Sequence, residues 1–310
     1  MVKKIISHLP PRHMDDFLGI ALLKFKYPEA KIEFIHPQSV PSEYLQDPEI
    51  ALIDVGGDYN PQLKNYDHHH DINLPSSVYL VLLGEFADFK PIVRLKSATE
   101  NFDLEKILNS QTLLFIDLTD RYGAKKASEL TQVMLDKKED GMRKEILLID
   151  LQKYGYEVGR TAIQTLSTFQ IYSEWLQNFY NQLDEQGFLD EPRAIIKKEE
   201  EAFFEKLSRA RAIEIAGFKV IISNESFAPF HYKVFEMGAE LIIERNSMNP
   251  KHTSIIKNTS NPKTSGLDLS GVFEIYPKIF LHPNGFIAVV DANIEDIDPD
   301  LIVKHIKKEV

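Results

Sequence analysis

The stretch from Leu52 to His70 reads LIDVGGDYNPQLKNYDHHH, and it indicates both the fold and the site of this chain. A short apolar segment ends at Asp54, and Asp67 precedes three consecutive histidines. Acids and imidazoles lose hydration on burial unless each finds a partner, and a divalent cation binds both kinds of group. The alternative interpretation is a solvated turn that binds metal only by accident. We favour a metal site because the start of the chain carries a second cluster of the same residue types.

The first sixteen residues contain that second cluster. Residues 2–7 (VKKIIS) predict a buried parallel strand. His8, His13, Asp15 and Asp16 follow it directly, and an apolar helical run begins after them. Open α/β sheets place their sites at the carboxyl ends of the strands, which is where these side chains fall. One of the two acids is also explained as a helix N-terminal residue that favours the helix dipole.

A further strand places Asp54 beside this cluster. Residues 31–36 (KIEFIH) alternate like a strand, and residues 49–55 (EIALIDV) predict a more apolar one. Asp54 would therefore end a strand at the same sheet edge as His8 and His13.

A third group of acids follows another apolar run. Asp117 and Asp120 come at the end of the sequence LLFIDLTD and are three residues apart, which would place them on one face of a helix. Either acid is a candidate to reach a metal.

The rest of the chain indicates a second domain. The pattern between about residues 125 and 186 is helical, and residues 185–192 form the clearest boundary. Beyond it, strands and helices alternate again. We therefore expect an α/β fold in two domains. Residues 1–186 would form a parallel-sheet domain with a helical connector, and residues 187–310 a smaller α/β domain.

The composition narrows the classes of function. The chain has 310 residues, of which 43 % are hydrophobic and 27 % charged, as in ordinary globular proteins. It has no cysteine, so any metal must be held by His, Asp and Glu. The net charge of −11 argues against binding nucleic acid through a generally basic surface, although a local basic cluster would still bind phosphate. We find neither a bilayer-length apolar run nor a signal-peptide pattern, and expect a cytoplasmic protein without a membrane partner.

These motifs, in this order, resemble the DHH phosphoesterase superfamily, and within it most closely the melanocyte-proliferating-gene exonuclease family. The elements that carry the resemblance are His8-x4-His13-x-Asp15-Asp16, Asp54-Val55-Gly56-Gly57, Tyr66-Asp67-His68-His69, Asp117-Leu118-Thr119-Asp120 and His282-x-x-Gly285-Phe286. The chain departs from that family in having Asp16 where Glu is common and His70 where Gln is more frequent.

The resemblance implies two divalent metals, usually Mn²⁺, that share one aspartate. Mg²⁺ and Zn²⁺ also suit oxygen and nitrogen ligands. By position, the first metal would be held by His8, His13 and Asp54, and the second by Asp15, Asp54, His68 and Asp120. Asp67 would orient His68, as second carboxylates commonly do for ligating histidines. His69 would face the scissile phosphate. Two cations about 3.5–4 Å apart activate water and neutralise phosphoryl oxygens.

For the C-terminal domain we expect contacts to substrate phosphate across a cleft between the domains. The candidates are Arg245, Lys257, His282 and Gly285, although each of them alone is also explained as a polar loop or surface residue. The expected function is hydrolysis of phosphodiester bonds by an exonuclease or oligoribonuclease. Its substrate would be a short single-stranded nucleic acid or a nucleotide. The alternatives are a small-molecule phosphatase or pyrophosphatase and a non-catalytic metal- or nucleotide-binding protein. Formation of a homodimer stays open.

Overall fold

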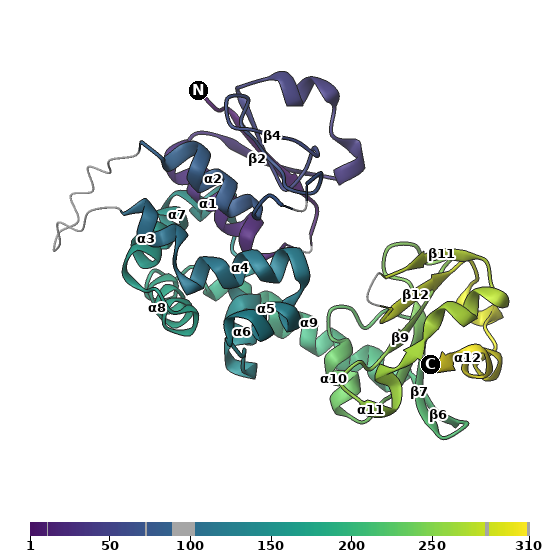
Figure 1. Cartoon of the computed structure of the whole chain (residues 1–310). Coiled ribbons are helices and arrows are strands. Elements are labelled where there is room, and N and C mark those ends of the chain that lie inside the picture. Colours follow the sequence, from purple (N-terminus) through teal and green to yellow (C-terminus); the bar gives the residue numbers. More distant parts are fainter. Residues whose placement is uncertain (11, 72, 89–102, 283–284, 309–310) are drawn as a thin grey trace. The chain divides into compact units, whose positions relative to one another are not determined.

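The computed structural model describes the chain except for residues 11, 72, 89–102, 283–284 and 309–310. The backbone divides into two compact units, Met1–Ala194 and Ile195–Val310 (Figure 1). Each contains a sheet and helices, so the predicted α/β class is confirmed. The division falls inside helix α9 (Asp190–Arg209), whereas the sequence suggested a boundary after residue 186. The domain limits therefore stay a prediction.

The N-terminal unit is built on a five-stranded sheet in the order β2-β1-β3-β5-β4. Its strands are β1 (Lys4–His8), β2 (Lys31–Ile35), β3 (Ile50–Ile53), β4 (Tyr59–Asn60) and β5 (Asn65–Tyr66). All neighbouring pairs are parallel except β4 and β5. Alternate residues of β1 face opposite sides. Ile5 packs into the large helical core, and Ile6 joins a smaller core with Leu45, next to the short 3₁₀ segments at 37–39 and 42–46.

Eight helices of this unit lie within the described residues. They are α1 (Met14–Lys26), α2 (Ser77–Phe86), α3 (Leu104–Leu108), α4 (Gln111–Tyr122), α5 (Ala124–Thr131), α6 (Lys137–Leu147), α7 (Leu151–Thr168) and α8 (Tyr172–Glu185). Helix α1 packs closely on α7 (Figure 1). A Cβ atom on Gly159 of α7 would lie 2.0 Å from the backbone oxygen of Ala21 in α1, so only glycine permits this approach.

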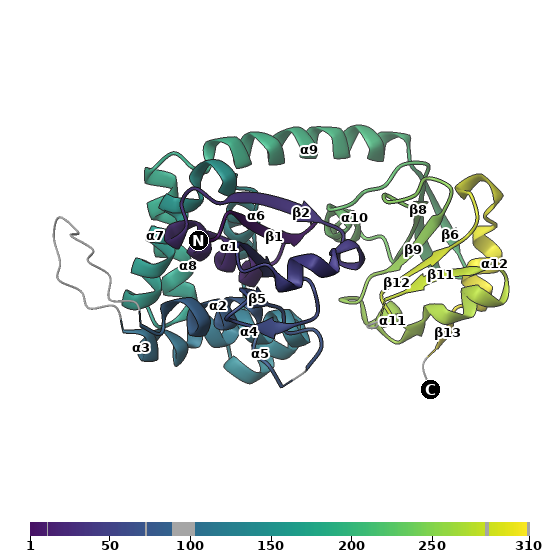
Figure 2. The same cartoon turned by 90° about the horizontal axis from the view of Figure 1, so that it is seen from above.

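The C-terminal unit contains a sheet, several strands of which are labelled in Figure 2. It has six strands in the order β11-β12-β9-β8-β7-β6. The strands are β6 (Arg211–Ile215), β7 (Phe218–Ser223), β8 (Leu241–Arg245), β9 (Thr253–Lys257), β11 (Lys278–Leu281) and β12 (Ile287–Val290). A separate pair is formed by β10 (Leu267–Asp268) and β13 (Lys307–Lys308), and the helices are α10 (His231–Glu236), α11 (Pro262–Ser265) and α12 (Pro299–His305). Within the six-stranded sheet, only β7 and β8 pair in parallel.

Two apolar clusters cover this second sheet. One contains Ile243 and Ile255 with Ile302 of α12, and the other contains Ile242 and Ile256 with Phe203 of α9. Neighbouring residues of β8 and β9 therefore alternate between the two clusters, as expected for strands covered on both faces. Within the residues that the structure describes, we find no helix with the length and hydropathy of a transmembrane segment.

Candidate metal centre

The candidate ligands of the N-terminal unit come from the ends of its strands and helices. His8 is the last residue of β1, Asp54 follows β3, and Asp67 and His68 follow β5. His13 and Asp15 lie at the start of α1, and Asp120 lies in the last turn of α4. Because parallel strands present their carboxyl ends at one sheet edge, residues far apart in sequence meet there.

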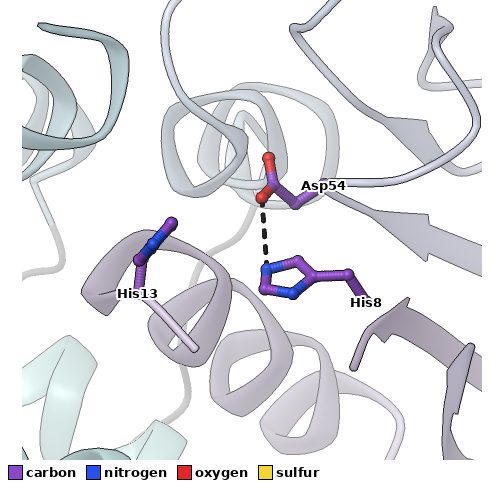
Figure 3. Close-up of side chains that lie close together, drawn as sticks. All are labelled: His8, His13 and Asp54. Carbon is purple, nitrogen blue, oxygen red and sulfur yellow. Dashed lines mark ion pairs between the residues drawn. The ribbon is translucent and has the colours of Figure 1, made fainter. Parts of the chain in front are cut away.

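One cluster consists of His8, His13 and Asp54, whose nearest ligand atoms all lie within 4.8 Å of one another (Figure 3). His8 Nε2 is 3.5 Å from Asp54 Oδ2. His8 Nδ1 lies 2.7 Å from the carbonyl oxygen of Leu9, which only accepts, so Nδ1 carries a proton. When the His8 ring is neutral, the lone pair of its Nε2 therefore faces the carboxylate of Asp54. Such an arrangement is favourable with a cation between the two atoms.

A second cluster consists of Asp15, Asp54, His68 and Asp120. His68 Nε2 lies 2.9 Å from Asp120 Oδ2 and 3.2 Å from Asp54 Oδ1, without the alignment of a hydrogen bond. Asp15 is fully buried, and neither of its carboxylate oxygens has a hydrogen-bond partner among the described residues. Buried carboxylates without donors are strongly unfavourable unless a positive charge compensates them. The cluster therefore fits a bound divalent cation.

Asp54 belongs to both clusters, and its two oxygens divide between them. Oδ2 faces His8 of the first cluster, and Oδ1 faces His68 of the second. Ser77 Oγ donates a hydrogen bond of 3.0 Å to Oδ1, which holds the carboxylate. Asp54 also has φ 58°, in the left-handed region that is uncommon for residues other than glycine. Strained backbone of this kind concentrates at functional sites.

The pKa values show that these clusters attract positive charge. Burial and the neighbouring carboxylates raise the pKa of Asp15 well above its ordinary value. Burial lowers the pKa of His68, but Asp120 and Asp54 outweigh that effect and raise it to about 10. For Asp120, burial opposes ionisation, yet the contacts with His13 and His68 bring its pKa below the ordinary value. A divalent cation would supply the charge that the protonated imidazole otherwise provides.

Asp67 contacts His69 rather than His68. Its Oδ1 lies 2.7 Å from His69 Nδ1 and accepts the backbone N–H of His69 at 3.0 Å, while Oδ2 accepts the N–H of Gly57 at 2.6 Å. The expected contact with His68 is absent from the described interactions because this local turn directs the carboxylate to the residue two positions on. These contacts outweigh the effect of burial and lower the pKa of Asp67. The His69 side chain is 61 % exposed, so it is accessible to a substrate.

A pocket of about 620 Å³ opens beside the first cluster. Its lining combines candidate ligands and catalytic residues with apolar side chains and two glycines: His8, His13, Asp54, Asp67, His69, Pro37, Val40, Leu45, Val55, Gly56 and Gly57. The pocket therefore offers an apolar wall next to the groups that would bind metal.

Asp117 and His70 lie outside the clusters found among the described residues. Asp117 accepts the backbone N–H of Ser76 at 2.7 Å and pairs with Arg121, so it holds the start of α2 to α4. His70 is exposed. Of the two acids in the third group, Asp120 is thus the one that reaches the ligands.

The candidate phosphate-binding residues of the C-terminal unit do not all come together: the backbone of Lys257 lies beside Phe286, near Gly285 and His282, but Arg245 lies apart from them. Arg245 and Lys257 lie at opposite ends of the β8–β9 pair, because Arg245 pairs with Thr253 and Lys257 with Leu241. Lys257 is buried, and its ammonium donates to the backbone oxygens of Ser265 and Leu267.

Arg245, His282 and Gly285 each have different contacts within the protein. Arg245 forms an ion pair with Glu295. His282 packs against Phe286 with ring centroids 4.2 Å apart, and partial burial lowers its pKa. Gly285 has φ 63° and donates its N–H to the His282 carbonyl oxygen at 2.7 Å, and residues 283 and 284 lie outside the described chain.

Two residues to which the sequence analysis gave no ligand role also lie against the clusters. Asp16 lies 3.5 Å from His8 Nε2 through its Oδ2, and Ser77 holds Asp54. Both stand at helix starts, so their sequence signal was that of ordinary N-terminal helix residues.

Residues 4–73 match the model of the MYG1 exonuclease family, described as "Uncharacterised protein family (UPF0160)". No match to a curated protein was found. Among solved structures, a pGpG-specific phosphodiesterase from Vibrio cholerae aligns with TM-score 0.43 and 15 % identity over 98 % of both chains. A DHH domain described as belonging to a family of ribosomal proteins aligns with TM-score 0.42 and 12 % identity, over 98 % of this chain and 85 % of that one. Similarity at this level assigns no substrate.

The matched residues contain three of the motifs on which the resemblance rested, from His8 through His69. The match to the family model therefore falls on the part of the chain where most of those motifs lie. Over residues 4–73, the chain is thus similar to the MYG1 exonuclease family.

Proposed function

We propose that this chain hydrolyses phosphodiester bonds of short single-stranded nucleic acids or nucleotides, and that it does so with two divalent cations, Mn²⁺ in the first place. The observation that carries the proposal is the position of Asp54 in two clusters of ligand atoms. A carboxylate with one oxygen toward each cluster suits two ions that lie close together.

The donor atoms favour this choice of metal. The two clusters offer only carboxylate oxygens and imidazole nitrogens, and the chain has no thiolate. Mixed oxygen and nitrogen ligands suit Mn²⁺ and Zn²⁺, whereas Mg²⁺ prefers oxygen alone. Bound at these positions, divalent cations would supply charge for the phosphoryl oxygens and acidify a water molecule.

The chain's own residues then have separable tasks. Asp54 would keep the two ligand sets at a fixed distance, since Ser77 restrains its carboxylate. Asp67 holds the Nδ1 side of His69, so the other ring nitrogen of this exposed side chain would face the substrate. The contact with Asp67 raises the pKa of His69, which favours the protonated ring, and a protonated ring would donate a charge-assisted hydrogen bond to phosphate.

The pocket favours a substrate with an apolar part. Pro37, Val40, Leu45 and Val55 line it beside the ligands, and no Lys or Arg is among the described residues that line it. Inorganic pyrophosphate offers only charged oxygens and gains nothing from such a wall, whereas a nucleobase buries apolar surface there. This supports a nucleotide or oligonucleotide over pyrophosphate. We propose further that Arg245, His282 and Gly285 contribute phosphate contacts.

The test is hydrolysis by the purified, metal-free chain after addition of Mn²⁺, Mg²⁺ or Zn²⁺. The substrates are a short single-stranded oligonucleotide, a linear dinucleotide, a cyclic dinucleotide and pyrophosphate. We expect cleavage of the oligonucleotide or the linear dinucleotide with Mn²⁺, and a much lower rate on pyrophosphate because it has no base to occupy the apolar wall. A chain that prefers pyrophosphate would contradict the proposed substrate class. A chain that binds Mn²⁺ but cleaves none of these would be a metal- or nucleotide-binding protein instead.

A further inference from the structure

Glu85 of helix α2 is a buried carboxylate outside the metal-ligand clusters found among the described residues. Its side chain has no exposed surface. It accepts hydrogen bonds from Lys26 Nζ at 2.6 Å, from the Tyr27 hydroxyl at 2.7 Å and from the Tyr66 hydroxyl, and it pairs with Lys64 Nζ at 2.8 Å. Burial opposes its ionisation, but these contacts outweigh burial and lower its pKa. Glu85 is therefore compensated within the protein and holds other side chains in place.

Tyr66 connects Glu85 to the candidate ligands. It is the last residue of β5, it is fully buried, and His68 stands two positions further on. The backbone oxygen of Tyr66 also accepts the N–H of Asp54 at 3.2 Å. A displacement of Tyr66 would thus move the backbones of two candidate ligands.

The ring of Tyr66 lies directly against the backbone of α2. A Cβ atom on Gly84 would lie 2.7 Å from Tyr66 Cε1 and 3.4 Å from the Tyr66 hydroxyl oxygen. The first distance is shorter than packed side chains tolerate, so a side chain at position 84 would displace the ring. Tyr66 is therefore fixed twice on α2, by a hydrogen bond to Glu85 and by close packing on Gly84.

Helix α2 also holds Asp54. Ser77, at the start of this helix, donates 3.0 Å to Asp54 Oδ1. Position 85 lies about 12 Å further along the helix axis, at a rise of about 1.5 Å per residue. One helix thus restrains Asp54 through its side chain near one end and Tyr66 through its hydroxyl near the other.

We propose that Glu85 and Tyr66 are positioning residues of the metal centre. Their contact sets the position of the segment that carries His68, so that His68 Nε2 faces Asp54 and Asp120. The inference rests on the proposed metal centre. Glu85 and Tyr66 would act on the spacing of the ligand atoms in the metal-free chain, and a site whose ligands are already spaced binds its ions more tightly.

Two matched pairs of variants test this by calorimetric titration of Mn²⁺ into the metal-free protein. Tyr66→Phe and Tyr27→Phe each remove one hydroxyl donor from the same carboxylate, but only Tyr66 adjoins the ligands. We expect the wild type to bind two ions. Tyr66→Phe should bind at least one of them about tenfold more weakly, and Tyr27→Phe should bind both within about twofold of the wild type.

Urea unfolding of the first pair separates positioning from stability. Each variant loses one hydrogen bond to Glu85, so both should unfold at a lower urea concentration than the wild type. A loss of stability lowers the apparent affinity for Mn²⁺ only in proportion to the folded fraction, which stays close to one without urea. A difference in Mn²⁺ affinity between the two variants therefore reports the placement of Tyr66.

The second pair moves the Tyr66 ring without removing a polar group. Gly84→Ala places a methyl group against that ring, whereas Gly141→Ala in α6 places one where no atom lies within 4 Å. We expect Gly84→Ala to weaken Mn²⁺ binding at least as much as Tyr66→Phe does. Gly141→Ala should bind both ions as the wild type does.

Three results would overturn the inference. The first is wild-type affinity for both ions in a folded Tyr66→Phe or Gly84→Ala variant, with folding judged by far-UV circular dichroism. The second is equal weakening in Tyr66→Phe and Tyr27→Phe, which would mean that the centre responds to any loss at Glu85. The third is a wild-type chain that binds no Mn²⁺, which would refute the metal centre and this inference with it. A wild-type chain that binds two ions but cleaves no phosphodiester would refute only the proposed function, and the affinities of the variants would still decide the inference.

Discussion

The buried charged groups of the candidate metal centre differ from a buried charged group of the C-terminal unit in how they are compensated. In the N-terminal unit, Asp15 is buried without a hydrogen-bond donor among the described residues, and Asp54 and His68 approach each other without hydrogen-bond alignment. In the C-terminal unit, Lys257 is equally buried but donates to two backbone oxygens. The buried carboxylates of the first arrangement need a bound cation to compensate their charge. The ammonium of Lys257 already has hydrogen-bond acceptors within the protein. Unsatisfied buried groups therefore distinguish a binding site from a structural contact better than residue type does.

The largest effect is expected from replacing Asp54, the residue shared by both ligand clusters. Asp54→Ala should lose both metal ions and reduce hydrolysis by several orders of magnitude, because each cluster loses a ligand and the bridge between them disappears. Elemental analysis of the dialysed protein gives the metal content, and the rate on a dinucleotide gives the activity. Retention of two metal equivalents would show that the ions do not share this carboxylate.

His68 and His70 allow the same comparison between a buried ligand candidate and an exposed residue within one segment. His68→Ala should abolish activity and weaken Mn²⁺ binding by about 10- to 100-fold, since His68 faces Asp54 and Asp120. His70→Ala should change metal content and kcat/KM by no more than a few fold, because His70 is exposed and belongs to none of the clusters found in the described chain. If both variants lost activity equally, the register of the Tyr-Asp-His-His motif would have been assigned wrongly.

The smallest effects are expected in the C-terminal unit. Lys257→Met should lower the free energy of unfolding by about 1–3 kcal/mol, because two buried carbonyl oxygens lose their donor, and should leave KM unchanged. His282→Ala should raise KM for a short oligonucleotide a few fold without loss of metal. Urea unfolding and steady-state kinetics on both variants separate the two roles. Unchanged KM in His282→Ala and in Arg245→Ala would remove this unit from substrate binding.

Much of the N-terminal site was predictable from sequence because strand ends converge. His8 ends an apolar strand and Asp54 follows one, and parallel pairing brings such ends to one edge. The same logic gave the α/β class. The position of a residue relative to its strand thus predicted that His8, His13 and Asp54 would lie at one edge of the sheet, whereas the division of the ligands into two sets came from the family resemblance.

Contacts that depend on side-chain direction were not predictable in this way. Asp67 was expected to contact His68, but a local turn directs it to His69. Lys257 looked like a surface base, yet its strand lies at the centre of the second sheet and its ammonium points to internal carbonyls. Strands β6 and β11 lie at the two edges of that sheet, where most of their positions are exposed, so their apolar pattern is a weak signal in the sequence.

The tight crossing of α7 over α1 has a consequence for the chemistry at the far end of α1. The absent side chain at Gly159 lets the two helices touch through their backbones at Ala21. Helix α1 also carries Asp15 and Asp16 in its first turn. A helix moves largely as a rigid rod, so a methyl group at position 159 would push its first turn as well as its middle. The positions of Asp15 and Asp16 thus depend on Gly159, which lies beside the middle of α1 and not at its first turn.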